Sequence, residues 1–192
     1  MPNYRARRRR AAMRETQTLA LELFVRHGFD SVTVEDVAEA AAMSASTIYR
    51  HFDTKEGLVL WHEFDQEVDA ALATRLPSHP PLTAILLALQ ESLAARWDDD
   101  PFQLQRVQFI YATEALHAAA VEQDFRDREE LAAALEGSLS RKQRANAPLL
   151  AGAALLAVDV AIDRWQATGG RPRLGTQLER AFASLGELAT LR

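Results

Sequence analysis

Apolar side chains recur along this chain every three to four residues, which is the spacing of one face of an α-helix. Residues that favour strands nowhere alternate with polar residues over any length. The pattern therefore predicts an all-α fold of about nine helices. They are expected over residues 8–27, 33–40, 44–51, 54–76, 82–97, 102–112, 113–142, 148–168 and 175–190.

Glycine and proline residues separate the predicted helices. Gly28 ends the first helix, because glycine readily takes the left-handed conformation that closes a helix. Proline-containing breaks follow at residues 77–81, 98–101 and 145–148. We therefore expect a basic arm, a compact three-helix domain and a larger helical domain, over residues 1–13, 14–60 and 61–192 respectively.

The composition excludes several kinds of chemistry. The 192 residues include no cysteine, which rules out disulfides, thiolate zinc sites, iron–sulfur clusters and a cysteine nucleophile. The five histidines have no metal-ligand spacing, and no glycine-rich phosphate loop or nucleophile motif occurs. We expect no metal, no cofactor and no enzymatic activity.

The longest apolar stretch runs from Ala147 to Ile162 and is interrupted by Gly152 and Asp159. It falls short of the ~18 apolar residues that a membrane span needs, so we interpret it as a buried helix. The N-terminal arginines are not followed by the apolar segment of a signal peptide. These features, with the lack of cysteine, predict a cytoplasmic protein that has no membrane partner.

Charge is distributed unevenly along the chain. The formal net charge is −5, yet residues 1–14 contain six arginines and no acidic residue. A basic arm on an acidic body indicates that contact with a polyanion is confined to one end. A merely solubilising tail is the alternative interpretation.

Two very short helices joined by a tight turn are predicted between Thr33 and His51. Helices of about two turns are not stable alone in water, so both must pack against the rest of their domain. Thr33 and Ser44 stand where the N-caps of these helices would lie. One compact buried face would consist of Val34, Val37, Ala38, Met43 and Ile48. This arrangement is typical of a helix-turn-helix, whose second helix enters the major groove of DNA.

The exposed face of the second short helix carries small or polar side chains. Such groups can donate to phosphate oxygens and base edges without keeping the backbone at a distance. The predicted DNA-contacting residues are Ser44, Ala45, Ser46, Thr47, Tyr49, Arg50 and His51. Lys55 begins the next helix, where its ammonium group would meet the same phosphate backbone.

Together these residues resemble the tetracycline-repressor (TetR) family of bacterial regulators. The resemblance is dense over about residues 14–60 and rests on order and spacing. Its matching segments are Leu23-Phe24, Gly28-Phe29, Thr33-Val34, Val37-Ala38, Ser44–Phe52 (SASTIYRHF) and Lys55–Leu58.

The resemblance implies a ligand-responsive transcriptional regulator, most simply a repressor that binds a palindromic operator as a homodimer. It implies phosphate contacts by Thr33, Tyr49, His51 and Lys55, and it places Ser44, Ser46 and Thr47 nearest the bases. One position departs from the family, because Ala42 stands in the turn where glycine is usual. A left-handed alanine costs roughly 1–2 kcal/mol, so either the turn differs or the fold absorbs this strain.

The arginine-rich arm gains significance from this context. A flexible arm before the first helix could reach into the minor groove beside the operator half-site. Arg7 and Arg8 are the predicted contacts.

The last two predicted helices are expected to form the dimer interface as a four-helix bundle. Apolar and small residues recur there at helical spacing, which permits close helix packing. The predicted interface residues are Ala151, Ala154, Leu155, Val158 and Ile162. The alternative is that this stripe belongs only to the core of one protomer.

An effector site is expected among the aromatic residues of the C-terminal helices. The candidates are Trp61, Phe64, Trp97, Phe109, Tyr111, His117 and Trp165. Few cations accompany them, which favours a small, largely apolar effector. The segments 87–97 and 106–123 are similar to regulators that accept acyl-CoA-like molecules. A helical partner-binding module that does not bind DNA is the alternative function.

Overall fold

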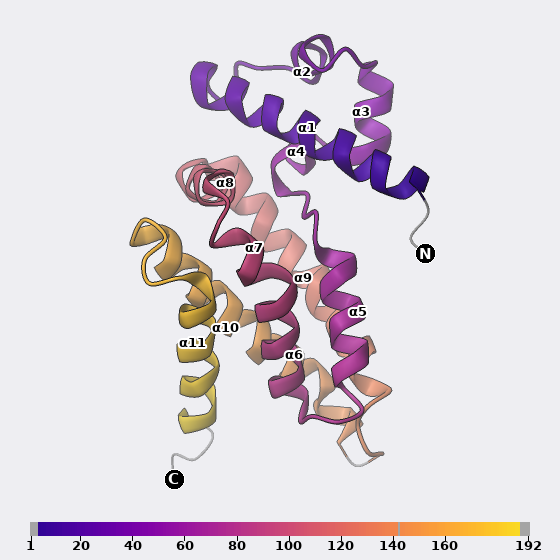
Figure 1. The fold of residues 1–192 in the computed structure, drawn as a ribbon, viewed down its shortest axis with the longest axis vertical. Helices are drawn as coiled ribbons and strands as arrows, with labels where there is room; N and C mark the ends of the chain where they lie inside the picture. Colours follow the sequence, from indigo (N-terminus) through magenta and orange to yellow (C-terminus); the bar gives the residue numbers. More distant parts are fainter. Residues whose placement is uncertain (1–3, 142, 189–192) are drawn as a thin grey trace. The chain divides into compact units, whose positions relative to one another are not determined.

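The computed structural model describes residues 4–141 and 143–188. Every regular element in these residues is helical, so the predicted all-α fold is confirmed (Figure 1). The chain forms two compact units. One contains the residues up to Glu63 together with Gln105–Ala120, and the other contains Phe64–Leu104 together with the residues from Val121 onward.

The first unit contains a small bundle of helices around one apolar core. Its own helices are α1 (Tyr4–His27), α2 (Val34–Ala40), α3 (Ala45–Phe52) and α4 (Gly57–Leu60). The end of α8 (Pro101–Ala112) and the beginning of α9 (Glu114–Glu136) complete it. The sequence prediction had placed residues 105–120 with the C-terminal helices, whereas Ile110 and Leu116 pack into the core of this first unit.

A buried polar cluster ends α4 after Leu60. Gln17 donates from Nε2 to the carbonyls of Val59 (3.2 Å) and Trp61 (2.9 Å), and Arg106 donates from Nη1 to that of Val59 (2.9 Å). Both polar side chains are only 1% exposed. The last carbonyls of a helix have no donor within that helix, and here the donors come from side chains that are distant in sequence. The single helix predicted over residues 54–76 is therefore wrong, because it is interrupted between α4 and α5.

Gly57 permits the sharp turn from α3 into α4. A Cβ atom at this position would lie 1.9 Å from the carbonyl oxygen of Phe52, which no side chain can occupy. The hydroxyl of Thr54 accepts a hydrogen bond from the Gly57 N–H at 3.0 Å. The glycine is thus required by close approach of the backbone.

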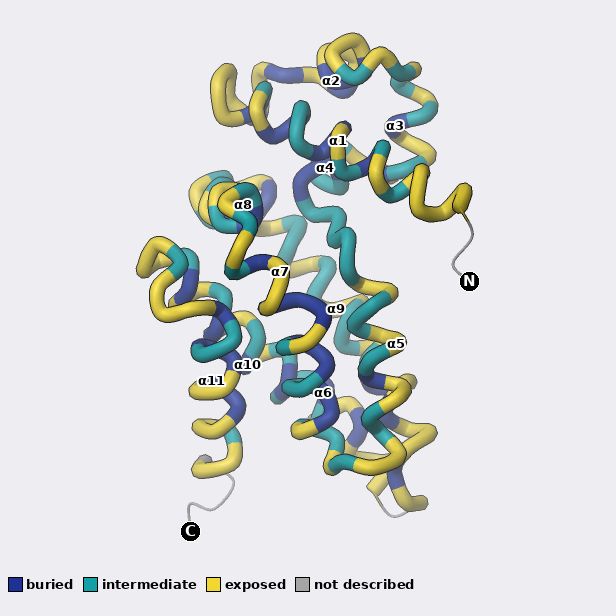
Figure 2. The backbone as a smooth tube through the Cα atoms, viewed as in Figure 1, coloured by how far each residue is buried: buried dark blue, intermediate teal, exposed yellow. Residues whose placement is uncertain are grey.

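The second unit is a larger helical assembly (Figure 2). It contains α5 (Asp65–Arg75), α6 (Pro81–Leu89), α7 (Ala95–Trp97), the rest of α8 and α9, α10 (Ala147–Ala167) and α11 (Leu174–Leu188). A π-helical turn, Gln90–Ala94, joins α6 to α7 where one continuous α-helix was predicted. The long helix predicted to end at residue 142 already ends at Glu136, and residues 189 and 190 of the last predicted helix lie outside the described residues.

Helices α10 and α11 pack against each other, and their buried residues are mostly small or apolar. Asp98, at the end of α7, accepts hydrogen bonds from the backbone N–H groups of Leu174 (2.6 Å) and Gly175 (3.4 Å). A carboxylate at the N-terminus of a helix satisfies its free donors and complements its dipole. This contact joins two segments of the second unit that are far apart in sequence.

One helical stretch, Arg144–Ala167, is long and apolar enough to cross a membrane, with a mean hydropathy of 1.8. The sequence prediction that no stretch reaches this length was wrong, because the helix continues through Gly152 and Asp159. Only 28% of its most apolar window is buried within the protomer. The interpretation as a buried helix therefore holds for one face of α10 only.

Candidate nucleic-acid interface

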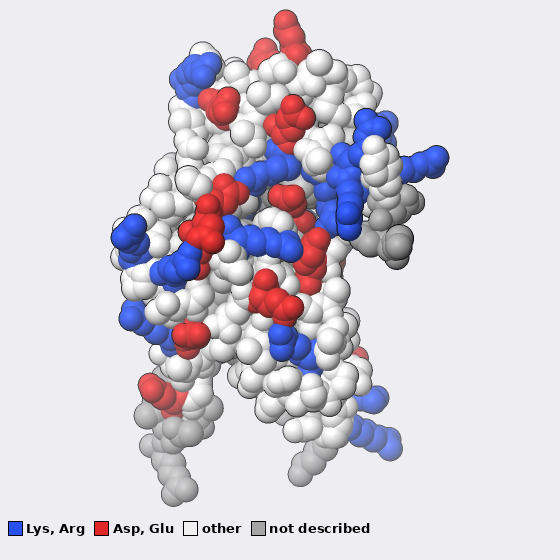
Figure 3. Space-filling view, viewed as in Figure 1, with Lys and Arg blue, Asp and Glu red and all other residues white. Residues whose placement is uncertain are grey.

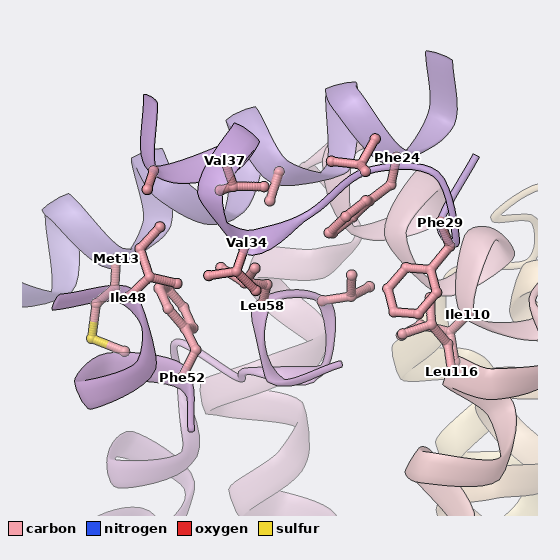
Figure 4. Packing of buried hydrophobic residues seen from close by; sticks show 14 residues of the cluster. Met13, Phe24, Phe29, Val34, Val37, Ile48, Phe52, Leu58, Ile110 and Leu116 are labelled. Carbon is pink, nitrogen blue, oxygen red and sulfur yellow. The ribbon is translucent and has the colours of Figure 1, made fainter. Parts of the chain in front are cut away.

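The short helices α2 and α3 are held by an apolar core that they share with α1 and α4. Val37 and Leu58 are fully buried, and Ile48 and Phe52 of α3 point into the same cluster (Figure 4). Burying such side chains contributes about 1.5–3 kcal/mol each, which compensates for the instability of helices this short. The predicted buried face is observed, except that Met43 is only half-buried and accepts a contact from the Thr16 hydroxyl at 3.4 Å.

Three hydroxyl groups cluster at the exposed beginning of α3. Ser44 is the N-cap and accepts a hydrogen bond from the Thr47 N–H at 3.2 Å. Its hydroxyl also lies 3.0 Å from that of Ser46 and 2.8 Å from that of Thr47. These hydroxyls bond to one another at the surface, so they can exchange these bonds for acceptors on a base edge or phosphate.

Exposed Tyr49 and Arg50 and half-buried His51 continue this surface along α3. Tyr49 is 46% exposed although it is a large aromatic residue. Burial, followed by the positive charges of Arg50 and Arg9, lowers the pKa of His51. Its buried Nδ1 atom has no hydrogen-bond partner in the part of the chain that the structure describes. A neutral imidazole beside two arginines can still donate one hydrogen bond to a phosphate oxygen.

The turn between α2 and α3 contains the strained alanine. Ala42 has a φ angle of 51°, and it is exposed. Its N–H donates to the carbonyl of Glu39 (3.1 Å), and the N–H of Met43 donates to that of Ala38 (2.9 Å). This pair of bonds is the Schellman motif, which requires a left-handed residue at the position of Ala42. The turn is therefore the usual one, and the fold absorbs the strain.

Two predicted phosphate contacts have structural roles within the first unit. The Thr33 hydroxyl donates to the Asp36 carboxylate (2.7 Å) and accepts from the Asp36 N–H (3.1 Å) in a capping box. The Lys55 ammonium donates to the Phe29 carbonyl and lies 4.3 Å from the centre of the Phe29 ring. Because these groups already have partners, they are less available to phosphates than the exposed groups of α3.

The N-terminal arginines extend α1 as a helix. The sequence prediction of a flexible arm is wrong, because α1 begins at Tyr4 and its first buried residue is Met13. Arg7 and Arg8 are exposed on this extension, as predicted contacts must be. Blue side chains gather around the N-terminal part of α1 in Figure 3. Sequence analysis did not single out Arg9, whose charge acts on His51 at the end of α3.

The predicted effector residues are divided between the two units. Trp61 and Phe109 pack against the helix-turn-helix core, and Tyr111 stacks on His117 with ring centres 5.3 Å apart, all within the first unit. The other three lie in the second unit, namely Phe64, Trp97 and Trp165.

Trp97 and Trp165 form a buried aromatic pair in the second unit, with ring centres 5.9 Å apart. Both are 2% exposed. Among the described residues, the Nε1 atom of Trp165 has no hydrogen-bond partner. An unpartnered buried N–H group costs roughly 1–3 kcal/mol, so this group could gain an acceptor from a ligand.

The predicted dimer stripe on α10 divides into two faces. Ala151 and Ala154 are fully buried by the protomer's own helices and cannot contact a partner, so these two residues belong to the core. Leu155, Val158 and Ile162 are only partly covered. Leu149 and Leu156 were not among the predicted interface residues, although they are 73% and 59% exposed. Their seven-residue spacing places them on one side of α10.

Carboxylates gather where α9 meets α10 in the second unit. Burial, with the negative charges of Asp124 and Asp127, raises the pKa of Asp159 to about 6. Burial also raises the pKa of Asp127. No set of three or more histidine or acidic residues in the described part of the chain is arranged to hold a metal ion.

Comparison with known proteins places these features in a family. Residues 18–60 match the bacterial regulatory proteins of the tetR family, and residues 79–189, more than half of the chain, match the MftR C-terminal domain. The chain therefore belongs to the TetR family of transcriptional regulators. Within that family, its C-terminal domain is of the MftR type. Members of this family are transcriptional regulators and not enzymes. Membership in a family of transcriptional regulators sets aside the alternative of a helical partner-binding module that does not bind DNA.

Individual relatives match only parts of the chain. TcmR, an HTH-type transcriptional regulator of Streptomyces glaucescens, is 36% identical over 86 residues, which cover 44% of this chain and 38% of TcmR. KstR2, an HTH-type transcriptional repressor of Rhodococcus jostii, is 40% identical over 45 residues, or 23% of this chain and 22% of KstR2. The chain thus matches well under half the length of either protein.

A solved structure shares the whole fold. The TetR-family repressor FadR of Thermus thermophilus, in complex with lauroyl-CoA, superimposes with a TM-score of 0.52. The match covers 94% of this chain and 96% of FadR at 20% identity. At this identity the similarity concerns the fold alone.

Proposed function

We propose that this regulator is a repressor that binds a palindromic operator as a dimer. The observation that carries the proposal is the exposed polar face of α3, whose opposite face packs into a buried apolar core. A recognition helix of this kind reads bases through its first residues, here Ser44, Ser46 and Thr47, while Tyr49 and His51 reach phosphates. Two copies would place their α3 helices one turn of DNA apart, ~34 Å.

The exposed apolar face of α10 supports the dimer. Leu149 and Leu156, which lie seven residues apart on one side of α10, present an exposed apolar surface that water would otherwise cover. A second copy of α10 and α11 would cover it and form a four-helix bundle.

Sedimentation velocity tests the dimer directly. Leu149→Glu with Leu156→Glu is expected to yield monomers, because two carboxylates per protomer would be buried without partners. Val25→Glu is the matched control, since Val25 is exposed on α1 of the first unit. Equal dimer formation by all three proteins would contradict the proposed interface.

A small, largely apolar effector is proposed to release the repressor from DNA. The Trp97–Trp165 pair and the unpartnered Trp165 Nε1 support a site in the second unit for an apolar molecule with one hydrogen-bond acceptor. The lauroyl-CoA bound to FadR makes acyl-CoA-like molecules the first candidates. A ligand releases the protein only if it binds the free conformation more tightly than the DNA-bound one.

Titration with lauroyl-CoA, acetyl-CoA and free laurate tests the effector class. Binding at the tryptophan pair should change tryptophan fluorescence in the wild type and less in Trp165→Phe. The same compound should release operator DNA. Release by laurate and lauroyl-CoA but not by acetyl-CoA would identify the acyl chain as the recognised group. Binding that strengthens the DNA complex would assign the opposite response, co-repression.

A further inference from the structure

The first nine described residues of α1 form a basic helix that projects beyond the body of the first unit. Tyr4 to Arg9 are all exposed, and Met13 is the first residue of α1 that packs into the core. At 1.5 Å per residue the projecting segment is about 13 Å long. It contains arginines and no acidic residue.

This basic helix lies next to the end of the recognition helix. Met13 sits beside Ile48 and Phe52 of α3 in Figure 4. Arg9 and Arg5 precede Met13 by four and eight residues, so they follow the same side of α1 outward from that contact. The charge of Arg9 acts on His51, the neighbour of Phe52. Arg9 of α1 therefore lies close to His51 at the end of α3, and Arg5 continues the same side of α1 outward from it.

The helical form of this segment decides how it can meet DNA. An α-helix with side chains is about 10–12 Å across, whereas the minor groove of B-DNA is about 6 Å wide. The major groove is the place for α3. A helix beside α3 then meets the phosphate backbone that borders the groove.

We propose that residues 4–12 are a phosphate-binding extension of α1, which lies along the DNA backbone beside the major groove and contacts phosphates through Arg5 and Arg9. The extension adds affinity and tolerates any sequence at the flanks of the operator. This inference rests on the proposed DNA-binding function of α3.

Salt dependence of binding tests the proposal in the full-length protein. Fluorescence anisotropy is measured with an operator duplex selected from genomic fragments, for the wild type and Arg5→Gln/Arg9→Gln. Loss of two phosphate contacts per protomer should reduce the slope of log affinity against log salt by about 3.6 for the dimer. Between 50 and 200 mM salt, the wild type should then lose roughly 100-fold more affinity than the variant. Arg141→Gln/Arg171→Gln makes the same charge change on exposed residues of the second unit and should leave the slope unchanged.

Neutral methylphosphonate linkages in the operator flanks locate the contact. They should weaken the wild type but not Arg5→Gln/Arg9→Gln. Exchange of A·T for G·C pairs in the flanks should have no effect. A preference for A·T flanks, with no effect of the methylphosphonates, would overturn the proposal in favour of a minor-groove arm.

A charge-neutral variant tests the helix itself. Ala6→Gly/Ala11→Gly lowers helix propensity on exposed positions and should weaken operator binding severalfold. Unchanged or tighter binding would overturn the helical mode. Loss of binding in Tyr49→Ala with the arginines intact tests the function of α3 separately, so failure of this inference and failure of the proposed function give different results.

Discussion

Replacing Ala42 by glycine should stabilise the DNA-binding unit. Ala42 holds a left-handed conformation with φ 51°, which costs an L-residue with a Cβ atom roughly 1–2 kcal/mol. Glycine avoids this cost, but it adds about 0.4–1 kcal/mol of conformational freedom to the unfolded chain. The methyl group of Ala42 is exposed, so its removal sacrifices no buried apolar surface. The net expectation for Ala42→Gly is a gain of about 0.5–1 kcal/mol in unfolding free energy.

The neighbouring Ala40 supplies a matched control. It is also exposed, but it is the last residue of α2 and is helical. The same change of alanine to glycine should there cost about 0.5–1 kcal/mol. The two variants differ only in the sign of the backbone angle, so their effects should have opposite signs.

Urea unfolding, followed by circular dichroism, measures both variants. The DNA-binding unit should unfold at higher urea in Ala42→Gly than in the wild type, and at lower urea in Ala40→Gly, with unchanged dependence on denaturant. Equal destabilisation by both substitutions would refute the left-handed turn. It would mean that Ala42 occupies an ordinary helical or extended conformation.

Two further substitutions test the contacts described above. Lys55→Gln removes an ammonium–carbonyl bond and a cation–π contact and should cost the first unit about 2 kcal/mol in urea unfolding, whereas a purely DNA-contacting lysine would leave stability unchanged. Asp159 has a folded-state pKa raised to about 6, so the folded protein binds this proton more tightly than the unfolded chain. Stability should rise as pH falls from 7.5 through 6 and level off near pH 4, by about 1 kcal/mol once solvent around the partly exposed carboxylate is considered. Asp159→Asn should reduce that rise in pH-dependent thermal melts and leave the contribution of Asp127, whose pKa is also raised. A rise of unchanged size would assign the effect to groups other than Asp159.

The helix-turn-helix could be predicted from the sequence because its determinants are local. The caps of α2 and α3 are Thr33 and Ser44, and the buried positions follow helical spacing over a few residues. A helix as short as α3 leaves few alternative ways to bury Ile48 while it exposes Tyr49. Such constraints act within one segment, so the pattern alone specifies them.

The end of α4 could not be predicted because its determinants are distant. The carbonyls of Val59 and Trp61, on either side of Leu60, accept hydrogen bonds from Gln17 and Arg106, which are 42 to 47 residues away along the chain. Nothing in the local pattern marks this break. The arginine-rich segment was predicted to be a flexible arm, but it is helical for a different reason. Arginine is a good helix former, and Met13 anchors α1, which runs through this segment from Tyr4.

The candidate effector and dimer residues were predicted less well because helical spacing does not say which element covers which face. Ala151 and Leu156 lie on the same apolar helix, yet one is buried by the protomer and the other is exposed. Trp61 and Trp165 were both predicted to line the effector site of the C-terminal domain, yet they belong to different units. Only tertiary packing distinguishes these positions.

The most direct test of the whole account is a binding titration with DNA from immediately upstream of the protein's own gene. Wild type and Tyr49→Ala are compared by fluorescence anisotropy at two salt concentrations. We expect tight, salt-dependent binding by the wild type that Tyr49→Ala weakens. Binding to this or any genomic fragment that is unaffected by Tyr49→Ala would contradict the assignment of α3 as the recognition helix.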